Sequence, residues 1–105
     1  MLDRNAAIGI VRNYVRDIQE HGVHLRAVIL FGSFAKGTQH EWSDIDVALV
    51  ADEFTGFYMN DKKLFPYVNI KKPYTIIEAV TYPTDYFNYS DPFINEIVKT
   101  GIKII

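Results

Sequence analysis

The fold of this chain is decided by residues 28–50, which read VILFGSFAKGTQHEWSDIDVALV. The stretch predicts an apolar strand, a Gly-Ser turn, a short basic segment and a second strand that begins with two aspartates. Because strand side chains alternate between faces, Asp44 and Asp46 place both carboxylates on one face, about 6.6 Å apart along the backbone. Two like charges this close are costly unless a cation neutralises them, and hard divalent metals bind carboxylate oxygens.

The turn before the aspartates predicts phosphate binding. Gly32 leaves the backbone bare and Ser33 adds a hydroxyl, which suits a phosphate lying against the chain. We expect residues 32–36 to begin a short helix whose free N–H groups point at the phosphates. Lys36 is either a cation for a phosphate oxygen or an ordinary surface lysine. The turn and the aspartate pair together predict a site for a nucleoside triphosphate and Mg²⁺.

Length and composition limit the possible classes of protein. The 105 residues predict one domain over 1–105, and 49% apolar residues are enough for a small core. The net charge of −2 predicts no general attraction to nucleic acid or to an anionic membrane. The absence of cysteine excludes disulfides and thiolate metal sites. With no signal-peptide pattern and no apolar run of about 20 residues, we expect a cytoplasmic protein.

Periodicity elsewhere predicts two longer helices and further strands. Residues 3–20 carry apolar residues at helical spacing, with Asp3 as N-cap and a solvated face that includes Arg4. Residues 25–31 are apolar almost throughout, which predicts a central strand. The other expected elements are strands over 43–51 and 74–80, a turn over 82–85, a helix over 93–100 capped by Asp91, and an edge strand or packed tail over 102–105.

Three features are each open to more than one interpretation. Glu78 is the only acid in an apolar run, so it is either an outward residue of an edge strand or a third carboxylate beside the aspartate pair. Trp42 either stacks on a base or a partner, or covers the edge of the core. Residues 54–70 have a helix-like apolar pattern that glycine and proline interrupt. The lysines of this region attract a triphosphate or an acidic partner, or are simply solvated.

Taken together, the Gly32-Ser33 turn, the Asp44-x-Asp46 pair and Glu78 resemble the nucleotidyltransferase superfamily that includes the DNA polymerase β palm. The strings GSFAKGT and SDIDV, with the tail DPFINEIVKTG, look like its minimal nucleotidyltransferase (MNT) branch in prokaryotes. The resemblance covers nearly the whole chain. It implies a single palm-like α/β domain, with a short mixed sheet, helices packed on one face and a metal site on the other.

The resemblance also implies roles for these residues. Asp44, Asp46 and Glu78 would be the catalytic and Mg²⁺-binding carboxylates, and Gly32, Ser33 and Lys36 would bind the phosphates of ATP. Glu78 would also accept the proton of the attacking hydroxyl, although many relatives carry Asp there. In the MNT branch the partner is a HEPN toxin. The implied reaction is transfer of AMP to a tyrosine hydroxyl of that toxin, which silences it.

Two other functions stay open at this point. One is an antitoxin that neutralises its partner by binding alone, with a degenerate active site. The other is a transferase acting on a small molecule such as an aminoglycoside. The chain is too short for a dedicated acceptor-binding domain, which favours a protein partner that presents its own hydroxyl. A nucleic-acid polymerase is disfavoured by the charge balance and by the lack of fingers or thumb.

Overall fold

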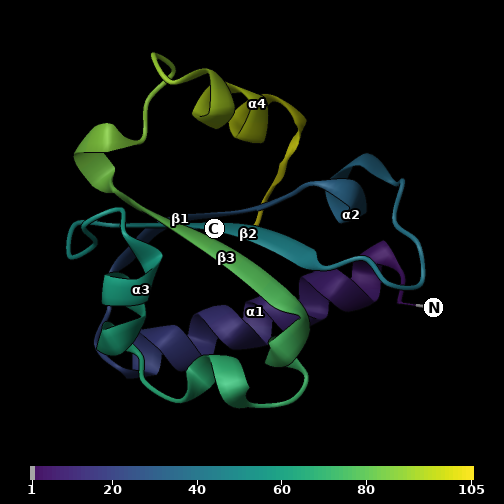
Figure 1. The fold of residues 1–105 in the computed structure, drawn as a ribbon, viewed down its shortest axis with the longest axis horizontal. Coiled ribbons are helices and arrows are strands. Elements are labelled where there is room, and N and C mark those ends of the chain that lie inside the picture. Colours follow the sequence, from purple (N-terminus) through teal and green to yellow (C-terminus); the bar gives the residue numbers. More distant parts are fainter. Residues whose placement is uncertain (1) are drawn as a thin grey trace.

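The computed structural model describes residues 2–105, and Figure 1 shows a sheet lying between helices. Short 3₁₀ turns connect α3 to β3. The elements run in the order α1 (Arg4–Glu20), β1 (Leu25–Phe31), α2 (Ser33–Lys36), β2 (Ile45–Ala51), α3 (Tyr58–Asp61), β3 (Ile77–Pro83), α4 (Pro92–Thr100) and β4 (Ile102–Lys103). Among the helices of residues 2–105, none has the length and apolar character needed to cross a membrane.

The sheet is mixed and has the strand order β3-β2-β1-β4. β1 runs antiparallel to both β2 and β4, whereas β2 and β3 are parallel. The two apolar strands of the deciding stretch therefore form the centre of the sheet, as their sequence predicts. The carboxyl-terminal residues supply the edge strand β4, one of the two outcomes expected for them.

The main core lies between the sheet and α1. The Asp3 side chain accepts a hydrogen bond from the Ala6 N–H at 2.8 Å, which caps the helix as predicted. Apolar residues at helical spacing then face the sheet, where they contact side chains from β1 and β2. The buried residues of α1 are Ala7, Val11, Tyr14, Val15 and Ile18.

The opposite face of the sheet carries α4, which corrects one detail of the expected fold. The α/β class and the mixed sheet are confirmed, but helices cover both faces and not one (Figure 1). The physical reason lies in β1, which is apolar on both sides. Ile97 of α4 is buried against Ile29 and Ala48, and the Phe93 ring meets Phe31 edge-on with centroids 5.9 Å apart.

The third strand begins later than its sequence predicts. Residues 74–76 form a 3₁₀ turn, so β3 covers residues 77–83 in place of 74–80. Tyr82 and Pro83, expected in a turn, are the last residues of the strand. Similarly, β2 begins at Ile45 and not at residue 43. These shifts matter because they set which residues of the parallel strands lie side by side.

A buried carboxylate organises the region after β2. Asp61 at the end of α3 is only 1% exposed. It accepts hydrogen bonds from the Thr55 amide and hydroxyl at 2.8 and 2.9 Å, from the Gly56 amide at 3.0 Å and from the Thr81 hydroxyl at 2.7 Å. These bonds join α3 and the preceding turn to β3. A buried carboxylate with four donors is satisfied without a cation.

Candidate active site

The central feature of the site is a pair of acids on neighbouring parallel strands. Asp46 of β2 is in register with Glu78 of β3. Asp46 is half-buried, whereas Glu78 is exposed on the edge strand. Residues in register on adjacent strands point to the same face, which for Asp46 is the face of Ala48 and α4. Both interpretations of Glu78 therefore hold at once: it is an outward residue of an edge strand and it stands beside an aspartate.

Asp44 lies just before β2 and is exposed. Burial raises the pKa of Asp46, and the charges of Glu78 and Asp44 raise that pKa further. Within residues 2–105, however, no three acidic, histidine or cysteine side chains are grouped closely enough to hold a metal ion. The two outer carboxylates are free to separate from Asp46 in solvent, because like charges repel. The donor set still fits Mg²⁺, whose ligands are carboxylate oxygens and whose charge would offset this repulsion.

Gly32 brings the phosphate-binding turn against these acids. It follows Phe31, which pairs with Asp46 across the sheet, and it has a φ of 75°. A Cβ at this position would collide with the Asp46 Oδ2. Only glycine allows both the left-handed φ and this close approach. The predicted Gly32-Ser33 turn therefore lies directly beside the predicted Asp46 carboxylate.

The residues after Gly32 form the predicted short helix. Ser33 is the first residue of α2, where the first amides have no acceptor inside the helix. Lys36 ends α2, and its Nζ lies 3.8 Å from the Glu96 Oε1 of α4. Both side chains are about half-exposed, and such ion pairs are weak. Lys36 can therefore turn to another anion, and its phosphate-binding role stays a prediction.

Arg4 is exposed, as its place on a solvated face predicts, but its guanidinium also makes contacts that the sequence does not indicate. Its Nε donates to the Phe34 carbonyl at 3.0 Å and its Nη2 donates to the Ala35 carbonyl at 2.8 Å. A Cβ at Gly37, which also has a φ of 75°, would lie 3.3 Å from this Nη2. The guanidinium therefore holds α2 and the turn before it against α1. Nothing in the sequence pattern indicates this contact, which joins residues 30 positions apart.

Trp42 does not cover the core, because its side chain is 82% exposed in the loop before β2. That observation removes one of the two interpretations of this residue. Stacking on a base or on a partner remains a prediction. The exposed indole lies two residues before Asp44 in the sequence, and it is available for contact with a ligand or another protein.

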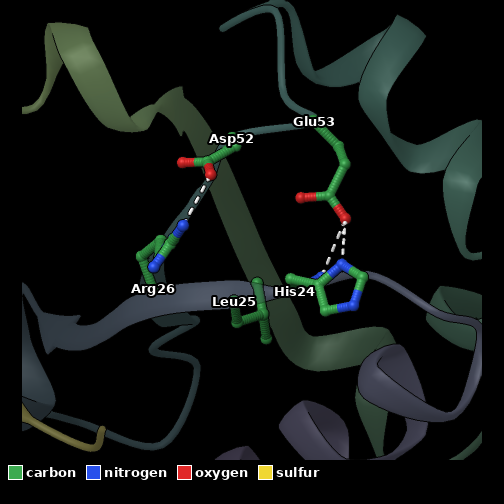
Figure 2. Close-up of a pocket in the computed structure, with 5 residues that line it drawn as sticks. All are labelled: His24, Leu25, Arg26, Asp52 and Glu53. Atoms are coloured by element: carbon green, nitrogen blue, oxygen red, sulfur yellow. Dashed lines mark hydrogen bonds and ion pairs between the residues drawn. The ribbon is translucent and has the colours of Figure 1, made fainter.

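A hollow of about 620 Å³ lies at the other end of the β1–β2 pair (Figure 2). A hydrogen bond between His24 Nδ1 and Glu53 Oε2 at 3.0 Å and an ion pair between Arg26 Nη2 and Asp52 Oδ2 at 2.8 Å line it. The hydrogen bond from Arg26 lowers the pKa of Asp52, and the backbone N–H of His24 lowers the pKa of Glu53. These contacts join the start of β1 to the residues that follow β2.

Comparisons with known proteins agree with this geometry. Residues 13–105 match the family model described as polymerase beta, nucleotidyltransferase. Among solved structures, the chain is similar to one described as "Crystal structure of the toxin-antitoxin with AMP-PNP", with a TM-score of 0.60 and 22% identity over 89% of this chain and 71% of that one. At this identity the likeness concerns the fold. No curated protein sequence matches the chain.

Proposed function

Because the chain belongs to the polymerase beta nucleotidyltransferase family, we propose that it transfers AMP from ATP to a hydroxyl of a partner toxin and so acts as an antitoxin. The observation that carries the proposal is the junction of Gly32, Asp46 and Glu78. A bare backbone turn, suited to phosphate, touches one carboxylate, and a second carboxylate lies in register beside it.

Each residue has a distinct role in the proposed reaction. Gly32 and Ser33 bind the β- and γ-phosphates, and Lys36 adds positive charge near them. Mg²⁺ held by Asp44, Asp46 and Glu78 would supply the charge that offsets the phosphate oxygens. Glu78, exposed at the sheet edge, accepts the proton of the incoming hydroxyl. The hydroxyl oxygen then bonds to the α-phosphorus, whose bond to pyrophosphate breaks.

The acceptor is proposed to be a tyrosine of a HEPN toxin. The resemblance to the MNT branch supports this choice, as does the similar fold of a protein solved in a toxin–antitoxin complex with AMP-PNP. The accessible position of Glu78 also suits an acceptor presented by another protein, because an edge strand is open from the side. ATP as the donor follows from the same resemblance, since no residue of the site reads the base.

Ligand binding tests the site without the partner. ATP with Mg²⁺ should raise the Tm of the chain more than either alone, because a ligand that binds only the folded state stabilises it. The double variant Asp44→Asn/Asp46→Asn should stay folded and lose that increment. Ser33→Ala should weaken triphosphate binding about ten- to hundredfold, since a hydrogen bond to a charged acceptor contributes about 1.5–3 kcal/mol. Equal shifts in wild type and double variant would refute the site.

One observation favours a second function, neutralisation by binding alone: the three carboxylates do not form a closed cluster within residues 2–105. The two functions separate in a growth assay with a co-expressed HEPN toxin. If the chain is an enzyme, Asp44→Asn/Asp46→Asn should fail to restore growth although it still binds the toxin. If it acts by binding alone, the same variant should restore growth as well as wild type does.

A further inference from the structure

The segment after α3 carries an exposed basic and apolar surface that the proposed reaction does not use. Residues 62–72 contain four lysines and no acid, in a chain whose net charge is −2. Lys71 pairs with Asp17 at 3.7 Å, and no other lysine of the segment has an ion pair within the described chain, residues 2–105. We call Lys62, Lys63, Leu64, Tyr67, Ile70 and Lys72 the lysine–tyrosine surface.

A hollow of about 220 Å³ lies in this surface. Lys62 and Lys63 lie along it, while Pro66, Tyr67 and Ile70 supply apolar walls. Tyr67 is 78% exposed and Ile70 is 73% exposed, so neither side chain contributes much to the core. Exposed apolar residues grouped around a hollow and bordered by charges are typical of interaction sites.

The surface is held rigidly although its side chains face solvent. Phe65 and Val68 of the same segment are fully buried in the main core. Asn69 Oδ1 accepts a hydrogen bond from the Tyr14 hydroxyl of α1 at 3.0 Å. Figure 1 shows the segment beside α1 on one side of the sheet, with α4 on the other. A partner bound here would therefore leave the Asp46 face open.

Tyr67 has a φ of 68°, in the left-handed region that favours glycine. A bulky residue at such an angle is strained, and its exposed ring gains little packing in return. Glycine would satisfy the backbone better. The fold does not need a bulky side chain at this position, which leaves the Tyr67 ring available for a contact outside the chain.

We propose that the lysine–tyrosine surface binds an acidic amphipathic segment of a partner protein, with an apolar side chain in the hollow and carboxylates at Lys62 and Lys63. Charge complementarity selects an acidic partner. The hollow favours a discrete side chain over a lipid surface, which needs only a flat basic and apolar patch. This inference stands independently of nucleotidyl transfer, since it concerns the opposite face of the sheet.

A phage library of random dodecapeptides tests the proposal, with wild type as bait and Lys62→Glu/Lys63→Glu for counter-selection. Enriched peptides should carry aspartate or glutamate around a large apolar residue. In a backbone amide NMR spectrum of labelled protein, they should shift signals of residues 62–72 and not those of residues 44–46. Their affinity should fall at least tenfold in the double variant, while Lys99→Glu/Lys103→Glu, a matched charge reversal elsewhere, should bind as wild type does.

Tyr67→Gly guards against a loss that merely reflects misfolding. It should keep or raise the Tm, because it relieves the left-handed backbone, and yet weaken peptide binding at least tenfold. The proposal would be overturned if the enriched peptides lacked acidic residues, or if the NMR shifts mapped away from residues 62–72. It would also be overturned if both variants, Tyr67→Gly and Lys62→Glu/Lys63→Glu, bound the peptides as tightly as wild type does. So would binding of phosphatidylserine vesicles or of an RNA oligonucleotide through these lysines in the absence of any peptide binding.

Discussion

Glu78 lies in register with Asp46 on the neighbouring parallel strand, so two carboxylates share one face at the edge of the sheet. Glu78 is exposed, whereas Asp46 is half-buried. Burial raises the pKa of Asp46, and the nearby charges of Glu78 and Asp44 add to that effect. The folded chain therefore holds its Asp46 charge at a cost to stability.

We expect Asp46→Asn to raise the Tm of the ligand-free protein at neutral pH. The folded-state pKa of Asp46 lies above its ordinary value of 3.8, so protonation of Asp46 stabilises the fold. This contribution is fully present below pH 3.8 and is lost as the pH rises through the folded-state pKa. The gain from the variant should therefore vanish in acid. Thermal scans from pH 3 to pH 7 measure it, with the exposed Asp85→Asn as the matched control. A gain that is absent at neutral pH, or equal at every pH, would contradict this cause.

Gly32→Ala should lower the free energy of unfolding by more than a similar change elsewhere. The new Cβ meets the Asp46 Oδ2 and the φ of 75° disfavours alanine, which together should cost about 2–4 kcal/mol. Gly22 is the matched control, because it has a φ of 89° but nothing within 4 Å of an added Cβ. Gly22→Ala should cost about 1 kcal/mol. Urea unfolding of both variants measures the difference, and equal losses would show that Gly32 does not closely approach Asp46.

Arg4→Ala should loosen α2 and the turn before it. The variant removes two charge-assisted hydrogen bonds to the Phe34 and Ala35 carbonyls, a loss of about 1–3 kcal/mol. Triphosphate affinity should fall with it, and Arg4→Lys should restore part of both. Arg12→Ala, on the same helix and exposed, provides the control. Calorimetric titration with ATP and Mg²⁺ measures affinity; if Arg4→Ala binds as tightly as Arg12→Ala, Arg4 does not position the turn.

Asp61→Asn should destabilise the protein by about 2–4 kcal/mol, because an amide nitrogen then faces donors that the carboxylate accepts. Burial alone would raise the pKa of Asp61, but hydrogen bonds from Thr81, Thr55 and Gly56 outweigh it and lower the pKa. The stability from Asp61 is therefore present above its unfolded value of about 3.9 and is lost as pH falls through the lower folded-state pKa.

Urea unfolding at pH 7 and at pH 3 checks this sign. The gap between wild type and Asp61→Asn should be wide at pH 7 and narrower at pH 3. The exposed Asp85→Asn should change little at pH 7. A gap that widens in acid would mean that the carboxylate is not the stabilising form.

The sequence predicted the parts of the fold that local periodicity controls. The capped helix that begins at Arg4, the strand 25–31 and the one-turn helix after Gly32 are confirmed almost residue for residue. Residues 54–70 showed only an interrupted helix-like pattern, and residues 74–76 were expected in a strand, whereas the structure has a one-turn helix and short 3₁₀ turns there. Their positions depend on Asp61, which accepts hydrogen bonds from donors up to 20 residues away. A buried acid of this kind has no local pattern.

The candidate site, like the fold, was predicted only in part from the sequence. Gly32 and Asp46 were predicted to belong to one site from their chemistry and spacing, and the antiparallel pairing of β1 with β2 brings them together. Glu78 was expected beside the aspartate pair in one of its two interpretations, and it lies in register with Asp46. The register itself could not be predicted, because it depends on where each strand of a parallel pair begins, and β3 begins three residues later than expected. Arg4 was missed for a similar reason, since its partners lie 30 and 31 residues away.

We propose that the junction of Gly32, Asp46 and Glu78 transfers AMP to a partner protein. Intact-mass spectrometry tests it directly: the chain is mixed with a HEPN toxin, ATP and Mg²⁺, and the toxin is then weighed. Wild type should add the mass of one AMP group for each modified hydroxyl, releasing pyrophosphate. Glu78→Gln should add little of it while still binding the toxin, because the proton acceptor is lost. A toxin that wild type inhibits on mixing but leaves unchanged in mass would contradict the account.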